Sequence, residues 1–208
     1  MTPIVVETVV KLGGGILAHA EYFDRVLAAI ADAARDHPLL IVPGGGPFAD
    51  AVREMDRRFH LPDDAAHWMA VLAMDQYAHL VSSRLSRGVV VAQMTDIAHA
   101  LDSNRVPVLA PSQWLREADP LPHSWDVTSD SIAAWVAGAV GARRLILVKP
   151  PRLRLSDRTG APGFGEASPG TADRDLVDAY FVRALPAHIT PVIVAADQVD
   201  VLCSALRA

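Results

Sequence analysis

The chain has 208 residues, of which 51% are hydrophobic and 21% are charged, with a formal net charge of -5 and a single cysteine, Cys203. This composition is typical of a folded globular protein with a sizeable core, and it excludes a general nucleic-acid binder and an internal disulfide framework. No apolar run reaches the roughly 20 residues of a membrane helix, and no secretory leader follows Met1. We therefore expect a cytoplasmic protein without nucleic-acid or membrane partners.

The first predicted strand, 4–12, is rich in β-branched residues and runs into a glycine triplet in the stretch VVKLGGG. Glycines let backbone N–H groups approach an anion, and Lys11 adds a positive charge, so the stretch fits phosphate binding. A tight turn beside a solvated lysine fits it equally well. The spacing matches neither GxxxxGK[ST] nor GxGxxG. Apolar residues at helical spacing then predict a helix over 21–35.

A second predicted strand, 39–42, runs into a second glycine triplet in the stretch IVPGGGPFADAVR. Pro47 favours the first turn of a helix, which we expect over 47–59. Two triplets at two strand ends are more specific than one, because a phosphoryl donor and an acceptor must both be held. Arg53 lies two turns into this helix and faces either that site or solvent.

The next predicted helix, from Asp63 and Asp64 to about Leu85, carries apolar residues on more than one face. Such a helix is either deeply buried or shared with a second subunit, so we expect a homodimer or a higher homo-oligomer. His67 and His79 lack metal-ligand spacing and are expected at the surface or in the core. Strands at 89–92 and 106–110 flank a short helix at 95–101.

A polar cluster in LPHSWDVTSDS precedes a helix of small apolar residues that ends near 140. Thr128 can cap this helix, and Asp130 in its first turn is favoured by the helix dipole. Asp130 could also hold the ammonium group of Lys11, with N–H groups of the helix start binding phosphate. His123 and Trp125 either line an acceptor pocket or are a loop residue and a buried aromatic.

The last part of the chain begins with a strand at 145–148, followed by Lys149, which is the second of two lysines among seventeen arginines. The stretch 150–170 is expected to be a mobile lid or a disordered excursion. We expect the remaining elements to be helices at 175–185 and 197–206 and a strand at 191–195. Short apolar strands alternating with helices predict an α/β fold, a three-layer αβα sandwich with a mainly parallel open sheet. Ligands bind such sheets at the carboxyl ends of their strands.

Taken together, these motifs resemble the amino acid kinase superfamily, which includes acetylglutamate, aspartate, carbamate and uridylate kinases. VVKLGGG resembles its first-strand Lys-x-Gly-Gly motif, VPGGG its second glycine loop, and TSDSIAAWVAGAVGA the helix start of bacterial uridylate kinases. LPHSWDVTSDS is most similar to the small archaeal branch that phosphorylates an aminomethylfuran-methyl phosphate in methanofuran biosynthesis. The resemblance spans about 9–206 and is specific through Val148.

The resemblance implies transfer of the γ-phosphoryl group of ATP, with Mg²⁺, onto a small phosphomonoester. Lys11 would contact the transferring group, and Asp130 would orient Lys11. Nucleotide phosphates would be bound by Gly13, Gly14 and Gly15, with Lys149 supplying a further positive charge. The resemblance implies that Gly44, Gly45 and Gly46 hold the acceptor and the bridging oxygens, and that Thr128 and Ser129 contact the acceptor phosphate. From the residues themselves, we add Arg53, His123 and Trp125 as candidate acceptor-binding residues. No protein metal ligands are predicted.

The sequence departs from the family pattern after Val148. KPPRLRLSDRTG stands where the family has Thr-Asp-x-Asp-Gly, unless Ser156 to Gly160 replaces that turn. Ala179 stands where the archaeal branch has a lysine, and the family's terminal strands are not expected before Ala208. We therefore predict one domain, 1–208, with an intact acceptor-binding half, 1–142, and a reduced nucleotide-binding half, 143–208.

These departures leave two functions open. One is a kinase for a small phosphate acceptor. The other is a catalytically impaired relative that binds, regulates or stores an oxyanion. A doubly wound NAD- or flavin-binding protein is a weaker third reading, because no acidic residue follows a GxGxxG at the expected distance.

Overall fold

The computed structural model describes residues 5–151 and 176–208, and its centre is one parallel sheet. The strands lie in the order β3-β4-β2-β1-β5-β6, and every neighbouring pair is parallel. Their bounds are β1 Thr8–Leu12, β2 Leu39–Pro43, β3 Gly88–Val91, β4 Val106–Leu109, β5 Arg144–Lys149 and β6 Thr190–Ala195. The predicted parallel α/β sheet is confirmed.

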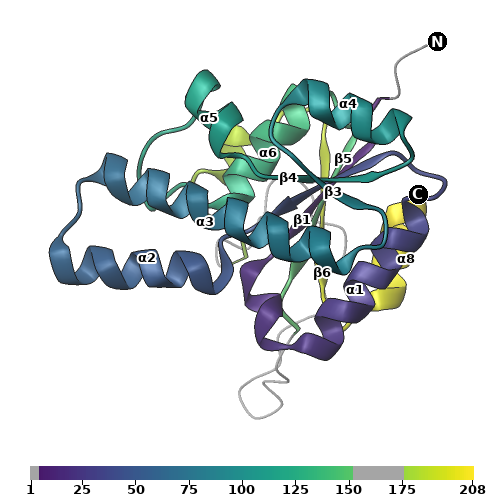
Figure 1. Cartoon of the computed structure of the whole chain (residues 1–208), viewed down its shortest axis with the longest axis horizontal. Helices are drawn as coiled ribbons and strands as arrows, with labels where there is room; N and C mark the ends of the chain where they lie inside the picture. The colour runs from purple at the N-terminus through teal and green to yellow at the C-terminus, as the bar shows by residue number, and fades with distance from the viewer. Residues whose placement is uncertain (1–4, 152–175) are drawn as a thin grey trace.

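Helices cover both faces of this sheet (Figure 1). The helices α4, α5, α6 and α7 pack on one face, which we call the α6 face, and α1 and α8 pack on the other. Their bounds are η1 Gly14–Ala18, α1 Ala20–Ala33, α2 Gly46–Phe59, α3 Asp63–Arg84, α4 Met94–Asp102, α5 Ser112–Ala118, α6 Ser129–Ala139, α7 Phe181–Ala184 and α8 Val199–Arg207. The predicted three-layer arrangement is confirmed.

Helix α3 carries apolar residues on several faces because it contributes to the cores on both sides of the sheet. Val71 and Met74 belong to the core of the α6 face, whereas Tyr77 and Val81 belong to the core on the opposite face. Its amino-terminal half runs beside α2, and the pair extends away from the sheet (Figure 1).

Two expected elements differ in the structure, and two elements were not expected. The helix predicted over 175–185 is wrong in its first part, since only Phe181–Ala184 is helical and the described residues before it form turns. The helix α5 and the short 3₁₀ helix η1 were not predicted. The predicted strand 4–12 begins at Thr8.

Most of the expected loop 150–170, including the Ser156 to Gly160 turn, lies outside the described residues. Within the described ranges, no helix has both the length and the apolar character needed to cross a membrane.

Candidate active site

Strand alternation directs both lysines to the same face of the sheet. Residues two apart on a strand point to the same side. In β1, Val9 lies in the core of the α6 face and Val10 in the opposite core, so Lys11 points toward the α6 face. In β5, Leu147 pairs with Lys11 and also lies in the α6 core, so Lys149 points the same way from two residues further along.

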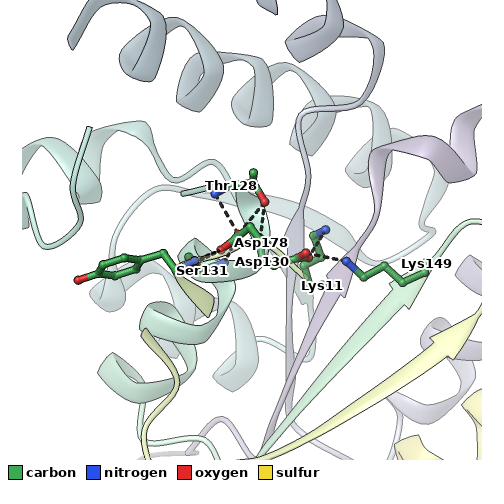
Figure 2. Close-up of polar contacts among 7 residues, drawn as sticks. Lys11, Thr128, Asp130, Ser131, Lys149 and Asp178 are labelled. Carbon is green, nitrogen blue, oxygen red and sulfur yellow. Dashed lines mark hydrogen bonds and ion pairs between the residues drawn. The ribbon is translucent and has the colours of Figure 1, made fainter. Parts of the chain in front are cut away.

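Asp130, in the first turn of α6, meets both ammonium groups (Figure 2). The Nζ atom of Lys11 lies 2.6 Å from Oδ1 of Asp130, and the Nζ atom of Lys149 lies 2.6 Å from Oδ2. The side chains of Lys11 and Asp130 are 5% and 6% exposed, and that of Lys149 is 19% exposed. We call these three residues the lysine–aspartate cluster. Two cations against one anion leave it a net positive charge.

The environment of the cluster shifts the pKa of two members. Burial disfavours the charged carboxylate, but the two ammonium groups outweigh burial and hold the pKa of Asp130 below its usual range. Burial and repulsion by Lys11 lower the pKa of Lys149, despite the attraction of Asp130. The cluster is therefore a site where an added anion would be stabilised.

The start of α6 is held by Asp178, which sequence reasoning did not identify (Figure 2). One carboxylate oxygen accepts hydrogen bonds from the Thr128 N–H at 2.9 Å, the Thr128 hydroxyl at 2.7 Å and the Ser131 N–H at 3.0 Å. The other oxygen accepts a hydrogen bond from the Ser131 hydroxyl. These bonds fix the segment before α7 as a turn, which explains why the predicted helix starts late.

Thr128 caps α6 as predicted, since its side-chain oxygen accepts a hydrogen bond from the Asp130 N–H at 3.4 Å. The expectation that the start of α6 leaves its N–H groups to a ligand is therefore corrected in part. The Ser131 N–H is occupied by Asp178, and the Asp130 N–H by Thr128.

Three helix amino ends converge beside the lysine–aspartate cluster. The glycine loops lead into η1 and α2, and Thr128 leads into α6. The first N–H groups of a helix have no partner within it, although those of Asp130 and Ser131 in α6 are already occupied by Thr128 and Asp178. A cavity of about 190 Å³ is bordered here by Gly14, Gly15, Gly45, Gly46, Thr128 and Ser129. The inner end of this cavity thus presents backbone donors to an anion.

Two of the predicted glycines have another role. The N–H of Gly13 donates to the Val148 carbonyl at 2.8 Å, and the N–H of Gly44 donates to the Leu12 carbonyl at 2.8 Å. These bonds continue the pattern of the sheet, and neither residue borders the cavity. The structure therefore places Gly13 and Gly44 behind the loops that a ligand would touch.

Close packing between the loops also requires glycine. A Cβ atom on Gly14 would lie 2.2 Å from backbone atoms of Gly46, so the two loops touch at this point. A Cβ atom on Gly15 would lie 2.6 Å from Pro150, which follows Lys149. The stretch that departs from the family pattern therefore packs directly on the first glycine loop.

The outer end of the cavity lies between α2, α3 and the loop before α6. Its polar and aromatic border residues are Asp50, Arg53, Asp63, His67, Ser124 and Trp125. The indole N–H of Trp125 donates to Asp56 at 2.7 Å, and the Arg53 guanidinium lies 5.0 Å from the centroid of the Trp125 ring. Arg53 also donates to Asp50 at 2.8 Å. Arg53 and Trp125 are thus brought together at this border, and their role in binding an acceptor stays a prediction.

His123 does not border this cavity, and its place at an acceptor pocket stays a prediction. Its ring nitrogens lie 2.6 Å from a carboxylate oxygen of Asp64 and 2.9 Å from one of Asp119. Its ring stacks on His67, with centroids 4.1 Å apart and planes 15° from parallel. The carboxylates fix His123 behind His67, so His67 borders the cavity instead.

The residues that sequence reasoning missed lack a periodic signal. His67, Asp50 and Asp63 are ordinary members of two helices, and their place at one cavity follows from how α2 and α3 pack. Asp178 had one usable signal, its position next to Ala179 in a stretch that resembles the family. In the described part of the chain, no three His, Cys, Asp or Glu side chains gather as a metal site.

Comparison with solved structures shows the class to which this fold belongs. The chain superposes on a uridylate kinase from Archaeoglobus fulgidus with a TM-score of 0.70 and 16% identity, covering 98% of this chain and 96% of that one. A UMP kinase from Bacillus anthracis gives a TM-score of 0.61 at 13% identity, covering 96% and 91%. At these identities the likeness shows that the chain shares the α/β fold of these structures.

Comparison of sequences shows the family. Residues 7–150 match the model of the amino acid kinase family, and this chain belongs to that family. A curated relative, the [5-(aminomethyl)furan-3-yl]methyl phosphate kinase of Methanocaldococcus jannaschii, is 25% identical over 181 residues, which cover 85% of this chain and 76% of the relative. The resemblance predicted from the motifs is confirmed, and the relatives are phosphotransferases.

Proposed function

We propose that the protein transfers the γ-phosphoryl group of ATP to the phosphate of a small phosphomonoester. The single observation that carries this proposal is the lysine–aspartate cluster beside three converging helix amino ends. Both reactants are anions, so catalysis would consist of positioning and charge neutralisation rather than activation of a side-chain nucleophile.

Each part of the site has a role in this proposal. Ser129, Gly45 and Gly46 bind the acceptor phosphate, and Gly14 and Gly15 bind the nucleotide phosphates. An acceptor phosphate oxygen attacks the γ-phosphorus as the bond between that phosphorus and the oxygen of departing ADP breaks. Lys11 neutralises charge on the transferring group, and Asp130 holds Lys11 and Lys149 at the site.

ATP fits this site because the cluster carries a net positive charge and the loop N–H groups face the cavity. ATP supplies the phosphoryl group, and Mg²⁺ bound to its phosphates would neutralise part of their charge. The described residues offer no cluster of three metal ligands, so phosphates and water would hold most of the Mg²⁺ coordination shell.

Lys149 replaces a missing cation in this proposal. Ala179 stands where the resembling archaeal branch has a lysine, and Lys149 reaches Asp130 from the end of β5 instead. We place nucleotide binding in the half formed by 143–208 and acceptor binding in the half formed by 1–142, within one domain in the cytoplasm.

For the acceptor we propose a compound of the class bound by the Methanocaldococcus relative, an aminomethylfuran-methyl phosphate, in methanofuran-type cofactor synthesis. The small cavity supports a compact acceptor, and Asp50 and Asp63 at its border support one with a positively charged amine. The test is release of ADP from ATP and Mg²⁺ with [5-(aminomethyl)furan-3-yl]methyl phosphate, with formation of the diphosphate followed by mass spectrometry. If the protein showed no turnover and bound neither compound, the proposal would be overturned.

A second candidate is a protein that binds an anion without phosphoryl transfer. Its support is the packing of Pro150 against Gly15, at the loop that would hold the nucleotide. It predicts calorimetric binding of phosphate compounds with no ADP release. Turnover that Lys11→Ala abolishes would exclude it.

We also propose that the chain forms a homo-oligomer through α3. Met69 and Leu72 are 37% and 43% exposed on this helix, although its other apolar residues are largely buried. An exposed apolar pair on a long helix is consistent with a second copy packing there.

A further inference from the structure

His67 occupies a distinctive position at the outer end of the cavity. It borders the cavity from α3, and its other ring face stacks on His123. The edge of Trp68 packs against it, with ring centroids 4.9 Å apart. Among the residues that the structure describes, no carboxylate or backbone group hydrogen-bonds to the His67 ring, so its nitrogens are available to a ligand.

His123 is held where it can fix the His67 ring. Asp64 belongs to the first turn of α3 and Asp119 follows α5, so the two carboxylates clamp His123 from two elements. The hydrogen bond that the His123 ring donates to the Asp64 carboxylate is the main cause that raises the pKa of His123 above its usual value. His123 is therefore held between two carboxylates, and its orientation sets that of the stacked His67 ring.

His67 is kept neutral in this arrangement. Burial and the neighbouring imidazole of His123 lower the pKa of His67 to about 4, despite the nearby carboxylates of Asp119 and Asp64. A neutral imidazole offers one N–H donor and one acceptor nitrogen without adding charge. It can therefore contact a polar group without repelling a cation.

The charge changes sign along the cavity. None of the three residues of the lysine–aspartate cluster borders the cavity, but the inner end is bordered by Ser129, which precedes Asp130, and by the glycine loop that follows Lys11. Asp50 and Asp63 border the outer end, where Arg53 is paired with Asp50. A ligand with an anionic and a cationic end would be oriented with its phosphate inward and its cation outward.

We infer that His67 is an acceptor-binding residue that contacts the organic part of an amine-bearing phosphomonoester, and that His123 is the positioning residue for His67. The inference rests on the proposed function and adds the residues that select the acceptor. It assigns recognition of the phosphate and recognition of the amine-bearing group to opposite ends of one cavity.

The experiment measures kcat and KM for [5-(aminomethyl)furan-3-yl]methyl phosphate at saturating ATP in the wild type, His67→Ala, His67→Gln and His123→Phe. We expect His67→Ala to raise the acceptor KM about tenfold, the size of one lost hydrogen bond, with little change in kcat. His67→Gln retains a neutral donor and acceptor and should restore part of the affinity. His79→Ala is the matched control, because His79 is an exposed histidine on the same helix.

The positioning role of His123 has its own readout. His123→Phe keeps an aromatic ring but loses both carboxylate contacts, so we expect a raised acceptor KM and an unchanged KM for ATP. In the double variant His67→Ala/His123→Phe, the combined effect on KM should be smaller than the sum of the effects of the two single variants. Thermal unfolding of every variant separates these effects from loss of fold.

The outcomes separate this inference from the proposed function. Absence of turnover and of acceptor binding in the wild type would overturn the proposed function, and the inference with it. Turnover with an unchanged acceptor KM in His67→Ala would overturn the inference alone. Equal kcat/KM for the wild type on the acceptor and on its analogue with a hydroxyl in place of the amine would contradict the amine-bearing class.

Discussion

The two ends of the cavity are built in different ways. The inner end consists of glycine loops and helix starts, and the nearly buried Lys11 and Asp130 lie behind it without bordering the cavity. The outer end consists of side chains from α2, α3 and a loop, and its carboxylates are exposed. The backbone therefore fixes the inner end, whereas the outer end depends on individual side chains that can change without altering the fold.

The largest expected effect is at the centre of the inner end. Asp130→Ala leaves two buried ammonium groups without their carboxylate, so we expect a loss of roughly 3–5 kcal/mol of unfolding free energy. Denaturant unfolding of the wild type and the variant measures this difference. The surface pair of Arg57 and Glu54 supplies a control, because Glu54→Ala should change stability by less than about 1 kcal/mol. Equal losses in the two variants would contradict a central role for Asp130.

Because of the same carboxylate, we expect the free energy of unfolding to depend on pH in the acidic range. Because the folded pKa of Asp130 lies below its usual value, its contribution to stability is complete above the unfolded pKa of about 3.9. It is lost as the pH falls through the folded pKa. Between the wild type and Asp130→Ala, the difference in unfolding free energy should stay constant above about pH 3.9 and shrink as the pH is lowered further. A difference that stays constant down to about pH 2 would contradict the ion-pair account.

The next largest expected effect is that of substituting Lys149 on nucleotide binding. Lys149→Ala should weaken calorimetric ATP binding by about tenfold to a hundredfold, as expected for one lost charge-assisted contact. Lys149→Arg should restore little, because a guanidinium does not reproduce a compact ammonium that reaches Asp130 at 2.6 Å. Unchanged binding in Lys149→Ala would show that the nucleotide does not use this end of β5.

Much of the inner end could be predicted from the sequence. Strand periodicity and the glycine triplets placed Lys11 and both loops, and the capping residue Thr128 placed Asp130 beside Lys11. Alternation along β5 also contained the signal that Lys149 shares this carboxylate, although the sequence analysis assigned Lys149 only to the nucleotide. These features repeat along the chain, so local sequence is sufficient to find them.

The outer end could not be predicted in the same way. His123 was expected at the acceptor, but two carboxylates from α3 and the end of α5 hold it behind His67. Asp178 acts on Thr128 across fifty residues. Such contacts depend on how separate helices pack, and no spacing within the sequence specifies them.

Asp178 joins the segment before α7 to the start of α6, and we expect its substitution to have a moderate effect on stability. Asp178→Asn removes the charge that accepts the N–H groups of Thr128 and Ser131, so we expect a loss of about 1–3 kcal/mol in unfolding free energy. Asp126→Asn is the control, because Asp126 is an exposed aspartate in the loop just before Thr128. Equal stability of the Asp178 variant and the wild type would contradict its role in holding α6.

At the outer end we expect a small spectroscopic effect. In His123→Phe, the pKa of His67 should rise above about 4, because the neighbouring imidazolium is removed while Asp64 and Asp119 remain nearby. It should stay below its usual value of about 6.5, since burial is the largest cause of the shift. Histidine resonances followed by NMR against pH measure this shift. A pKa that falls or stays unchanged would contradict the stacked-pair account.

The smallest expected effect on activity concerns assembly of copies through α3. Leu72→Asp should lower the mass in solution, measured by light scattering, with little change in the melting temperature, because Leu72 is exposed in the single chain. An unchanged oligomer mass would show that this helix face is not the contact between copies.

The central claim is tested most directly by ADP release from ATP and Mg²⁺ in the presence of [5-(aminomethyl)furan-3-yl]methyl phosphate, with the wild type and Lys11→Ala compared side by side. The account predicts acceptor-dependent turnover by the wild type and a decrease of at least about 10²–10³-fold in kcat for the variant, since one charge-stabilising group is removed. Equal ADP release by the two proteins, or acceptor binding by the wild type without any turnover, would contradict it.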